Sequence, residues 1–260
     1  MRILAIGDIV GKKAVKKITE ELKQLKDIEN IDFIIANAEN AADDGNGISR
    51  QAYEQILNSG VDIITLGNHT WGNEEIYEFI EEPRIIRPAN ASRGRPGKGY
   101  TIYEKDNIKI LVINLIGRRF MEGVYYSDNP FVEVDEILKE VGKDIKIIIV
   151  DFHAAWTGEK FVMGYFLDGK VSAVYGTHTH VQTADEMILP KGTGFITDIG
   201  MTGSYCSELG TDPESGLERY LKDLPTTNIM SENPIMINGC IFDVDEDTGK
   251  TTNIKRIHIL

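Results

Sequence analysis

Short apolar runs alternate with amphipathic segments along the first half of the chain, and this pattern predicts alternating strands and helices. A continuous apolar run bounded by turn residues indicates a buried strand, and apolar residues at helical spacing indicate an amphipathic helix. Strands are predicted over 2–7, 33–36, 62–66, 100–103, 108–114, 145–150 and 171–175. Helices are predicted over 13–25, 49–58, 74–81 and 131–141, with Ser49 and Asn73 as N-terminal caps.

Strands predominate in the second half of the chain. They are predicted over 186–189, 194–197, 235–244 and 253–260, with one short helix over 214–222. We therefore predict an α/β protein with two stacked mixed β-sheets flanked by helices, an αββα sandwich. Because no Pro/Gly/Ser-rich linker divides the sequence, we expect a single domain over residues 1–260.

Side chains with metal-binding chemistry stand at the ends of five predicted strands. Open α/β sheets bind their ligands at the carboxyl ends of the strands, so these side chains are candidates for one common site. Four of the five histidines occupy such positions, which is hard to obtain by chance. The candidate metal ligands are Asp8, Glu39, Asn40, Asn68, His153, His178 and His180.

The segment 176–180, Gly-Thr-His-Thr-His, is the strongest of these signals. Side chains alternate between the two faces of an extended chain, so we expect His178 and His180 to project to the same side. Two histidines spaced in this way are more often ordinary core or surface residues, and the Asn-rich turn at 37–40 is compatible with plain turn chemistry. Because the histidine pair and the Asn-rich turn both follow predicted strands, we favour metal binding for both segments.

The chemistry of the seven candidate ligands points to two metal ions. Carboxylate, amide and imidazole donors without thiolate favour manganese, iron or zinc over calcium, and they are too many for one tetrahedral zinc. Two ions about 3.5–4 Å apart can generate hydroxide from a bridging water and neutralise the oxygens of a displacement at phosphorus. Glu39 has two oxygens and a central place among the strand ends, so we expect it to bridge the ions. The sequence therefore predicts a phosphoesterase with a dinuclear metal site.

His69 follows the candidate ligand Asn68 but is not needed for coordination. Hydrolysis of a phosphate ester leaves an alkoxide that needs a proton, and a well-placed histidine can supply it. We predict that His69 is the general acid.

Other functional interpretations of the chain fit less well. The segment 7–11 lacks both the G-x-G-x-x-G fingerprint of dinucleotide binding and the serine of a Gly-Asp-Ser esterase, where Ile9 stands. The basic segment 84–98 is interpreted as a solvated loop, with phosphate binding by an arginine as the alternative. Its basic residues are Arg84, Arg87, Arg93, Arg95 and Lys98. The role of Arg118 and Arg119 is left open.

Composition narrows the range of partners. A net charge of −13 and a pI near 4.9 disfavour duplex nucleic acid, whose binding rewards Lys and Arg, but are compatible with a small phosphorylated substrate. The two cysteines, Cys206 and Cys240, are interpreted as reduced thiols of a cytosolic protein rather than as a disulfide. The sequence shows no signal peptide and no apolar run of membrane-spanning length, so we expect a cytoplasmic protein without a membrane partner.

Blocks of sequence around the candidate ligands form a recognisable set. They are G-D-I-V-G, N-A-E-N-A-A, T-L-G-N-H-T-W, R-P-A-N, D-F-H-A, G-T-H-T-H-V-Q-T-A-D and I-T-D-I-G-M-T-G, and they extend from Gly7 to Gly203. Through them the chain resembles the calcineurin-like metallophosphoesterases and, within these, the YmdB-type bacterial branch. The match covers most of the chain.

The chain departs from the broader superfamily at three positions. The superfamily has histidine where Val10 stands, aspartate where Glu39 stands, and often an acidic residue where Thr70 stands. The resemblance implies that Asn40 replaces the ligand missing at Val10. It assigns one ion to Asp8, Glu39, Asn40 and His180, and the other to Glu39, Asn68, His153 and His178.

The resemblance implies a cytoplasmic phosphodiesterase that acts on cyclic nucleotides, 2′,3′-cyclic, 3′,5′-cyclic or both. It also implies two bound transition-metal ions, divalent or trivalent, of which iron and manganese are the leading candidates. It further implies self-association into a homo-oligomer. One alternative is an enzyme for another phosphoester, such as a phosphomonoester or an RNA end. A second alternative is a regulatory protein that binds metal and nucleotide with incidental turnover.

Overall fold

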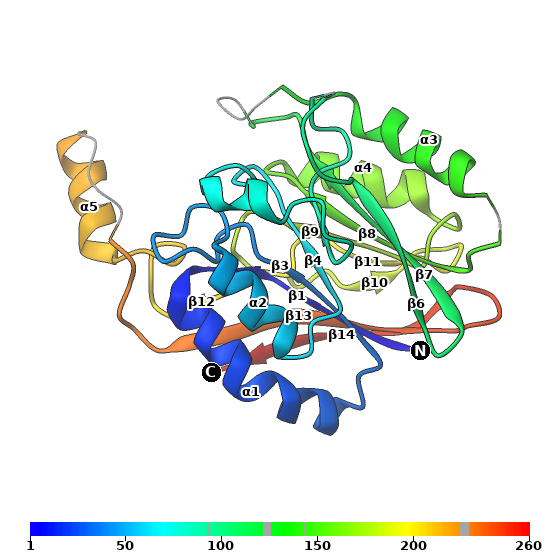
Figure 1. Cartoon of the computed structure of the whole chain (residues 1–260), viewed down its shortest axis with the longest axis horizontal. Helices are drawn as coiled ribbons and strands as arrows, with labels where there is room; N and C mark the ends of the chain where they lie inside the picture. Colours follow the sequence, from blue (N-terminus) through cyan, green and yellow to red (C-terminus); the bar gives the residue numbers. More distant parts are fainter. Residues whose placement is uncertain (93, 122–125, 143, 224–228) are drawn as a thin grey trace.

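Two β-sheets lie face to face in the middle of the molecule, and helices cover their outer faces (Figure 1). The structure is a computed structural model, and it describes residues 1–92, 94–121, 126–142, 144–223 and 229–260.

The first sheet has the strand order β2-β12-β13-β1-β3-β4-β5, and β14 also pairs with β13. Its strands are β1 (Arg2–Ile6), β2 (Asp8–Ile9), β3 (Phe33–Asn37), β4 (Ile63–Thr65), β5 (Ile85–Ile86), β12 (Met201–Ser204), β13 (Ile235–Val244) and β14 (Thr251–Ile259). Strands β1, β3, β4 and β5 are parallel, whereas β13 is antiparallel to β1, β12 and β14. The first sheet is therefore mixed.

The second sheet has the strand order β10-β11-β9-β8-β7-β6. Its strands are β6 (Tyr100–Lys105), β7 (Ile108–Ile116), β8 (Ile147–His153), β9 (Ala173–Thr177), β10 (Met187–Ile188) and β11 (Gly194–Ile196). The four inner strands are parallel, and the edge strands β6 and β10 are antiparallel to their neighbours. Both sheets are thus mixed, which confirms the predicted fold class.

Side-chain alternation along the strands divides the apolar core into three layers. In β1, Ile3 and Ala5 face the second sheet, while Leu4 and Ile6 face the outer helices. The middle layer joins apolar residues of both sheets, and the two outer layers bury the helices. The helices are α1 (Gly11–Glu29), α2 (Arg50–Asn58), α3 (Pro130–Val141), α4 (Thr157–Leu167) and α5 (Pro213–Lys222).

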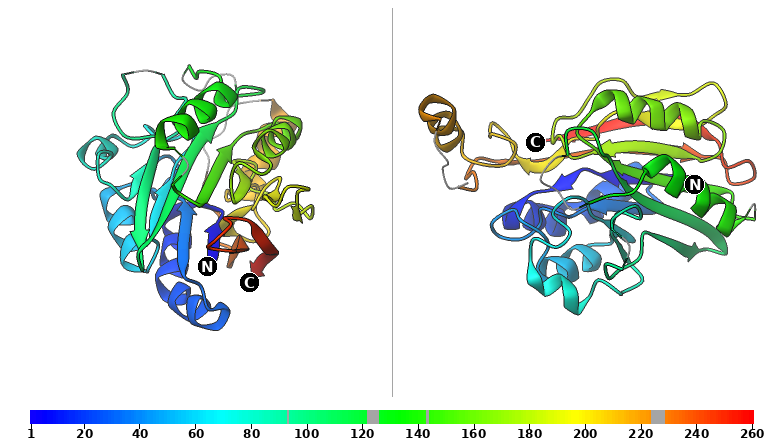
Figure 2. Two further views of the ribbon diagram at one scale, coloured as in Figure 1. Left: turned by 90° about the vertical axis from the view of Figure 1, so that its right-hand side faces the viewer. Right: turned by 90° about the horizontal axis from the view of Figure 1, so that it is seen from above.

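The helices are divided between the two outer faces. α1 and α2 pack on the first sheet, and α3 and α4 pack on the second, so the two pairs lie on opposite sides of the sheets (Figure 2). α5 stands apart from the sandwich (Figure 1). The observed layers are those of the predicted αββα arrangement.

Both predicted N-terminal caps are present. The hydroxyl of Ser49 accepts a hydrogen bond from the backbone N–H of Ala52 at 3.2 Å. The side-chain oxygen of Asn73 accepts one from the backbone N–H of Glu75 at 3.0 Å. Each cap satisfies a backbone donor that has no partner within its own helix.

The helix predicted over 74–81 is wrong in type and length. A 3-10 helix covers Glu74–Glu78, and Phe79 already leaves helical geometry with a φ of −139°. Turns continue to Glu82, and Pro83 then excludes further helix, because proline lacks an N–H and disfavours helical backbone in the residue before it. In contrast, α1 is longer than the predicted 13–25 and ends at Asn30, which has a left-handed φ of 53°.

The sequence pattern did not predict α4, nor the short strands β2, β5 and β12. The helix buries Glu159 and Lys160 beside apolar residues, so polar and apolar positions do not separate into two faces. Hydrophobic periodicity detects a helix only when they do. The missed strands are two to four residues long, too short for an alternation to be recognised.

Two further features concern the described part of the chain. Cys206 is exposed and Cys240 is buried, and both are free thiols. None of the helices in this part is long and apolar enough to cross a membrane.

Candidate metal centre

The parallel strands of both sheets direct the seven candidate ligands toward one edge of the sandwich. β2, β3 and β4 of the first sheet lead to the oxygen donors, and β8 and β9 of the second sheet lead to the histidines. The oxygen donors are Asp8, Glu39, Asn40 and Asn68, and the histidines are His153, His178 and His180. The two sheets therefore supply chemically different halves of the site.

One group of donors surrounds the ring nitrogen Nε2 of His153. This atom lies 2.8 Å from Asn68 Oδ1, 3.0 Å from Glu39 Oε1 and 3.1 Å from His178 Nδ1. Ligand atoms of Glu39, His153 and His178 all lie within 4.8 Å of one another. Four donors of the types that transition metals accept thus converge on a small volume.

A second group lies beside the first and includes Asp8, Asn40 and His180. Asp8 Oδ1 lies 3.9 Å from His180 Nε2 and 3.8 Å from His153 Nδ1. Asp8 Oδ1 and Asn40 Oδ1 are both buried without a hydrogen-bond partner. A buried polar atom left without a partner costs about 1–3 kcal/mol, which a cation at this position would offset. The residues present therefore fit a metal ion here as well.

The backbone at His178 and His180 is not extended, so the geometric reason given for their convergence is wrong. Their φ angles are 96° and 63°, in the left-handed region. Asp8 Oδ2 accepts a hydrogen bond from the backbone N–H of His178 at 3.2 Å, and His180 Nδ1 lies 2.9 Å from the carbonyl oxygen of Leu209. Strained backbone of this kind clusters at functional sites. The two imidazoles face different donor groups instead of projecting as a parallel pair.

A buried relay fixes the tautomer of His153. The hydroxyl of Thr177 donates to Asp151 Oδ1 at 2.7 Å and lies 2.9 Å from His153 Nδ1. Because the hydroxyl proton is already engaged by Asp151, Nδ1 of His153 must donate to Thr177. In the neutral ring, the form that binds a metal, the lone pair of Nε2 is then directed at the donor group, which is the usual way in which a ligating histidine is held.

Charges inside the site shift the pKa values of its members strongly. Burial would raise the pKa of Glu39, but the neighbouring His153 outweighs this and lowers it to about 2. Burial alone would lower the pKa of His153, but Glu39 and Asp8 raise it to about 9. Burial and the adjacent His153 lower the pKa of His178 to about 3, and burial raises the pKa of Asp8. Such mutually dependent ionisation is typical of functional sites.

A buried ion pair holds the segment 177–180, which carries His178 and His180 and is called the histidine loop below. Lys160 Nζ lies 2.6 Å from Asp198 Oδ2 and donates to the carbonyl oxygen of Thr177 at 2.8 Å. Asp198 also accepts hydrogen bonds from the backbone and hydroxyl of Thr179, at 3.2 and 2.7 Å. The sequence analysis proposed no role for Asp151, Lys160 or Asp198. Asp151 and Asp198 directly follow the predicted strands 145–150 and 194–197, which is the position that identified the candidate ligands. Lys160 has no such position in the sequence.

His69 lies at the edge of the site and is partly exposed. Its backbone N–H donates to Glu39 Oε2 at 2.7 Å, and its ring atom Nδ1 lies 2.8 Å from Asn46 Oδ1. Thr70 is fully buried and its hydroxyl donates to the carbonyl oxygen of Gly67 at 2.6 Å. Thr70 is thus engaged with backbone, and Asn46 contacts the imidazole.

Gly67 keeps the space between the donors open. A Cβ atom at this position would lie 2.4 Å from the ring of His153 and 2.5 Å from Glu39 Oε2. No side chain can be added here without displacing a candidate ligand.

Most of the described arginines in segment 84–98 have structural contacts. Arg84 donates to the carbonyl oxygens of Val61 and Asp62, and Arg87 donates to those of Pro88, Ala89 and Arg95. The guanidinium of Arg95 lies over the ring of Trp71, 4.3 Å from its centroid. Arg93 lies outside the described residues. Arg118 and Arg119 line a separate cavity of about 370 Å³ with Asn129 and Glu159.

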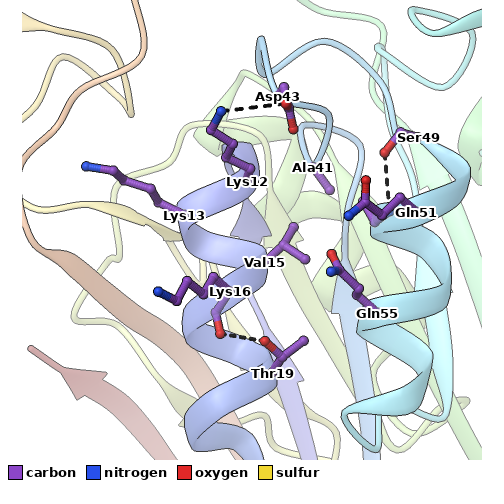
Figure 3. A pocket seen from close by; sticks show the side chains of 11 residues that line it. Lys12, Lys13, Val15, Lys16, Thr19, Ala41, Asp43, Ser49, Gln51 and Gln55 are labelled. Carbon is purple, nitrogen blue, oxygen red and sulfur yellow. Dashed lines mark hydrogen bonds and ion pairs between the residues drawn. The ribbon is translucent and has the colours of Figure 1, made fainter.

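A lysine-lined groove of about 360 Å³ runs between α1 and α2 (Figure 3). Lys12 lies 3.7 Å from Asp43, Lys16 lies 3.7 Å from Glu20, and Lys13 pairs with Glu232. Each lysine therefore has a carboxylate nearby that compensates its charge. The groove thus lacks the uncompensated positive charge of an anion-binding site.

The fold and the donor set define the class of protein: the chain is a calcineurin-like metallophosphoesterase, a hydrolase of phosphoric esters that uses metal ions. A family model described as YmdB-like protein matches residues 4–257. The chain belongs to the YmdB-like family.

Known relatives are similar over the whole chain. A 2′,3′-cyclic-nucleotide 2′-phosphodiesterase of Bacillus subtilis (strain 168) is 45% identical over 260 residues, which cover 100% of this chain and 97% of the relative. The crystal structure of a novel phosphatase from Mycoplasma pneumoniae is 34% identical with a TM-score of 0.94, covering 100% of this chain and 93% of that one. A protein of Thermus thermophilus described as hypothetical is 36% identical with a TM-score of 0.92, covering 99% and 98% of the two chains.

Proposed function

We propose that the chain hydrolyses cyclic nucleotides at a dinuclear metal site, with 2′,3′-cyclic monophosphates as the principal substrates and 3′,5′-cyclic monophosphates as further candidates. The observation that carries this proposal is the convergence of Asn68, Glu39 and His178 on His153 Nε2. A buried oxygen of Asp8, for which the described residues offer no hydrogen-bond partner, lies 3.8 Å from Nδ1 of the same ring. The described activity of the Bacillus subtilis relative supports the choice of substrate.

The donors divide into two sets that share Glu39. In this proposal one ion is held by Asp8, Glu39, Asn40 and His180, and the other by Glu39, Asn68, His153 and His178. Bound iron or manganese would supply a hydroxide nucleophile at neutral pH and neutralise charge on the phosphoryl oxygens. Glu39 is assigned to both ions because a carboxylate has two oxygens, one of which lies 3.0 Å from His153 Nε2.

The protein's own contribution to the reaction is proton transfer and positioning. In the hydrolysis of a 2′,3′-cyclic nucleotide, an oxygen from water bonds to phosphorus, the bond from phosphorus to O2′ breaks, and O2′ receives a proton. The product is a nucleoside 3′-monophosphate. We assign the proton to His69, whose backbone is held against Glu39 and whose ring is directed by Asn46.

Metal analysis combined with a turnover screen tests the proposal. The purified protein is incubated with 2′,3′- and 3′,5′-cyclic AMP, with an oligonucleotide that ends in a 2′,3′-cyclic phosphate, and with a phosphomonoester. We expect about two transition-metal ions per chain and conversion of 2′,3′-cyclic AMP to 3′-AMP.

The same screen separates the alternatives. Turnover of the phosphomonoester or oligonucleotide without turnover of free cyclic nucleotides would make the chain an enzyme for another phosphoester. Nucleotide binding without turnover, unchanged in the His69→Ala variant, would indicate a regulatory binding protein.

A further inference from the structure

We propose that Asn46 is the positioning residue of His69, and that it takes the place of the acidic neighbour that the chain lacks at Thr70. This inference rests on the proposed function of His69 as the general acid. Asn46 belongs to the turn-forming segment 43–47, Asp-Asp-Gly-Asn-Gly, to which the sequence analysis gave no role. The structure places its side chain 2.8 Å from the His69 ring.

The hydrogen bonds of Asn46 determine which way its amide group faces. Asn46 Nδ2 donates to the carbonyl oxygen of Gly72 at 3.2 Å, and that carbonyl can only accept. The amide oxygen therefore faces His69 Nδ1, and Nδ1 must carry the proton that it donates. Nε2 of His69 is left for the substrate.

The backbone around Asn46 is built to present this side chain. Gly45 and Gly47 on either side have φ angles of 77° and 81°, a conformation that L side chains rarely adopt. A Cβ atom at Gly72 would lie 2.2 Å from Asn46 Oδ1, so only glycine admits the amide at this distance. The backbone N–H of Asn46 donates to Asp44 Oδ1 at 3.0 Å, which closes the turn.

The amide can orient the imidazole but adds no charge to it. A ring that is free to rotate about its side-chain bonds presents Nε2 to the leaving oxygen only part of the time, and misplacement of about 1 Å can cost up to about 100-fold in rate. Asn46 removes that freedom from one side, while the bond from the His69 backbone to Glu39 fixes the other end of the residue. The effect of Asn46 on the reaction should therefore pass entirely through His69.

Replacement of Asn46 by Ala in the metal-loaded protein tests this inference. We expect kcat to fall about 10- to 100-fold on phosphodiesters with poor leaving groups, with KM and metal content unchanged. On esters with good leaving groups such as nitrophenolate the fall should be less than about threefold, since little protonation is needed there. In the His69→Ala background the same replacement should change kcat by less than about twofold.

Two further variants give the comparison its controls. Asn46→Asp keeps an oxygen acceptor for Nδ1–H but loses the donor to the carbonyl oxygen of Gly72, so it should restore only part of the lost rate. Asn73→Ala removes a cap from the same cluster of loops without touching His69, so it should affect good and poor leaving groups equally. Loss of metal from Asn46→Ala, equal losses on both kinds of ester, or a full additional loss in the His69→Ala background would overturn the inference.

Failure of the inference can be distinguished from failure of the proposed substrate. The dependence of rate on the leaving group is measured with a series of aryl phosphodiesters, which needs no cyclic nucleotide. An independent readout is the ¹⁵N NMR spectrum of His69 in protein loaded with diamagnetic zinc in place of iron or manganese, with the signal identified by its absence from His69→Ala. Asn46→Ala should shift its Nδ1 signal, whereas Asn73→Ala should not; no shift in Asn46→Ala would contradict a hydrogen bond to this nitrogen.

Discussion

At the scale of single residues, His69 is the position where chemistry and structure can be separated most sharply. Its ring contacts Asn46, which is not a candidate ligand, and its backbone bond to Glu39 does not depend on the side chain. We expect His69→Ala to keep its fold and metal content while the rate on 2′,3′-cyclic AMP falls roughly 10²–10⁴-fold. Parallel assays with a nitrophenyl ester should show a much smaller loss. Equal losses on the two substrates would assign His69 to binding instead.

Glu39 and Asn40 are adjacent in sequence but should differ in their effect on metal content. Glu39 contacts His153 directly, whereas Asn40, whose Oδ1 is buried without a hydrogen-bond partner among the described residues, is proposed to hold only the ion beside Asp8. Elemental analysis of Glu39→Ala should show both ions lost, and Asn40→Ala should retain about one per chain. If Glu39→Ala still held one ion tightly, Glu39 would not be the shared ligand.

Residue types and their place after strands were enough to predict the convergence of four candidate ligands, Glu39, Asn68, His153 and His178. The reason is that parallel strands end at one edge of a sheet, so a pattern local in sequence has a fixed consequence in space. The contact between Asn46 and His69 could not be predicted in this way. It joins two loops whose contacting residues are 23 positions apart, and it depends on the left-handed backbone at Gly45 and Gly47. The pattern of apolar residues in the sequence carries no information on either.

At the scale of elements, α4 supports the histidine loop through Lys160. Replacing Lys160 by Met would leave Asp198 buried without its cation, which typically costs about 3–5 kcal/mol. Urea unfolding should show this loss, and adding Asp198→Asn should recover part of it. No recovery would mean that Lys160 acts by packing and not by charge.

The pairing of β1 with β13 carries a pH-dependent contribution. Arg2 donates to both oxygens of Asp243, at 2.6 and 3.0 Å, and this hydrogen bond lowers the pKa of Asp243. A lowered carboxyl pKa adds stability above the unfolded value of about 3.9, and this stability disappears as the pH falls through the folded value. The pair is partly exposed, so Asp243→Asn should cost no more than about 1 kcal/mol at neutral pH and less at pH 3. Denaturation at both pH values measures the difference, and an equal cost at both would exclude the ion pair.

The ends of helices could be predicted from the sequence where a local hydrogen bond determines them. Ser49 begins α2 because its hydroxyl caps the helix, and this can be read without tertiary structure. α4 could not be read in the same way, since its buried Lys160 is stabilised only by a partner 38 residues away. Tertiary contacts decided that element.

At the scale of the whole molecule, α5 offers a surface for self-association. It stands apart from the sandwich and exposes Leu217, Tyr220 and Leu221 at 58%, 78% and 76% (Figure 1). We predict that a second copy of the chain binds to this apolar face.

The salt dependence of this association should be opposite to that of nucleic-acid binding, whose affinity falls as salt rises. Each chain carries a net charge of −13, so copies repel one another at low ionic strength and an apolar contact should strengthen as salt screens that repulsion. Sedimentation analysis should show more dimer at higher salt, and Tyr220→Glu should abolish it while Tyr77→Glu has no effect. An unchanged dimer in Tyr220→Glu would place the contact elsewhere.

The order of the donors along the chain has a consequence for how the protein is made. All the candidate oxygen ligands lie before residue 70 and all the candidate imidazole ligands lie after residue 150, on different sheets. During synthesis the chain emerges from its N-terminus, so the early half presents carboxylates and amides without any of their nitrogen partners. The first sheet itself is incomplete until β13 enters between β1 and β12, close to the end of translation. On the proposed ligand assignment, a growing chain on the ribosome has no finished centre with which to capture the wrong cation, and we expect metal loading to be the last event of its biogenesis.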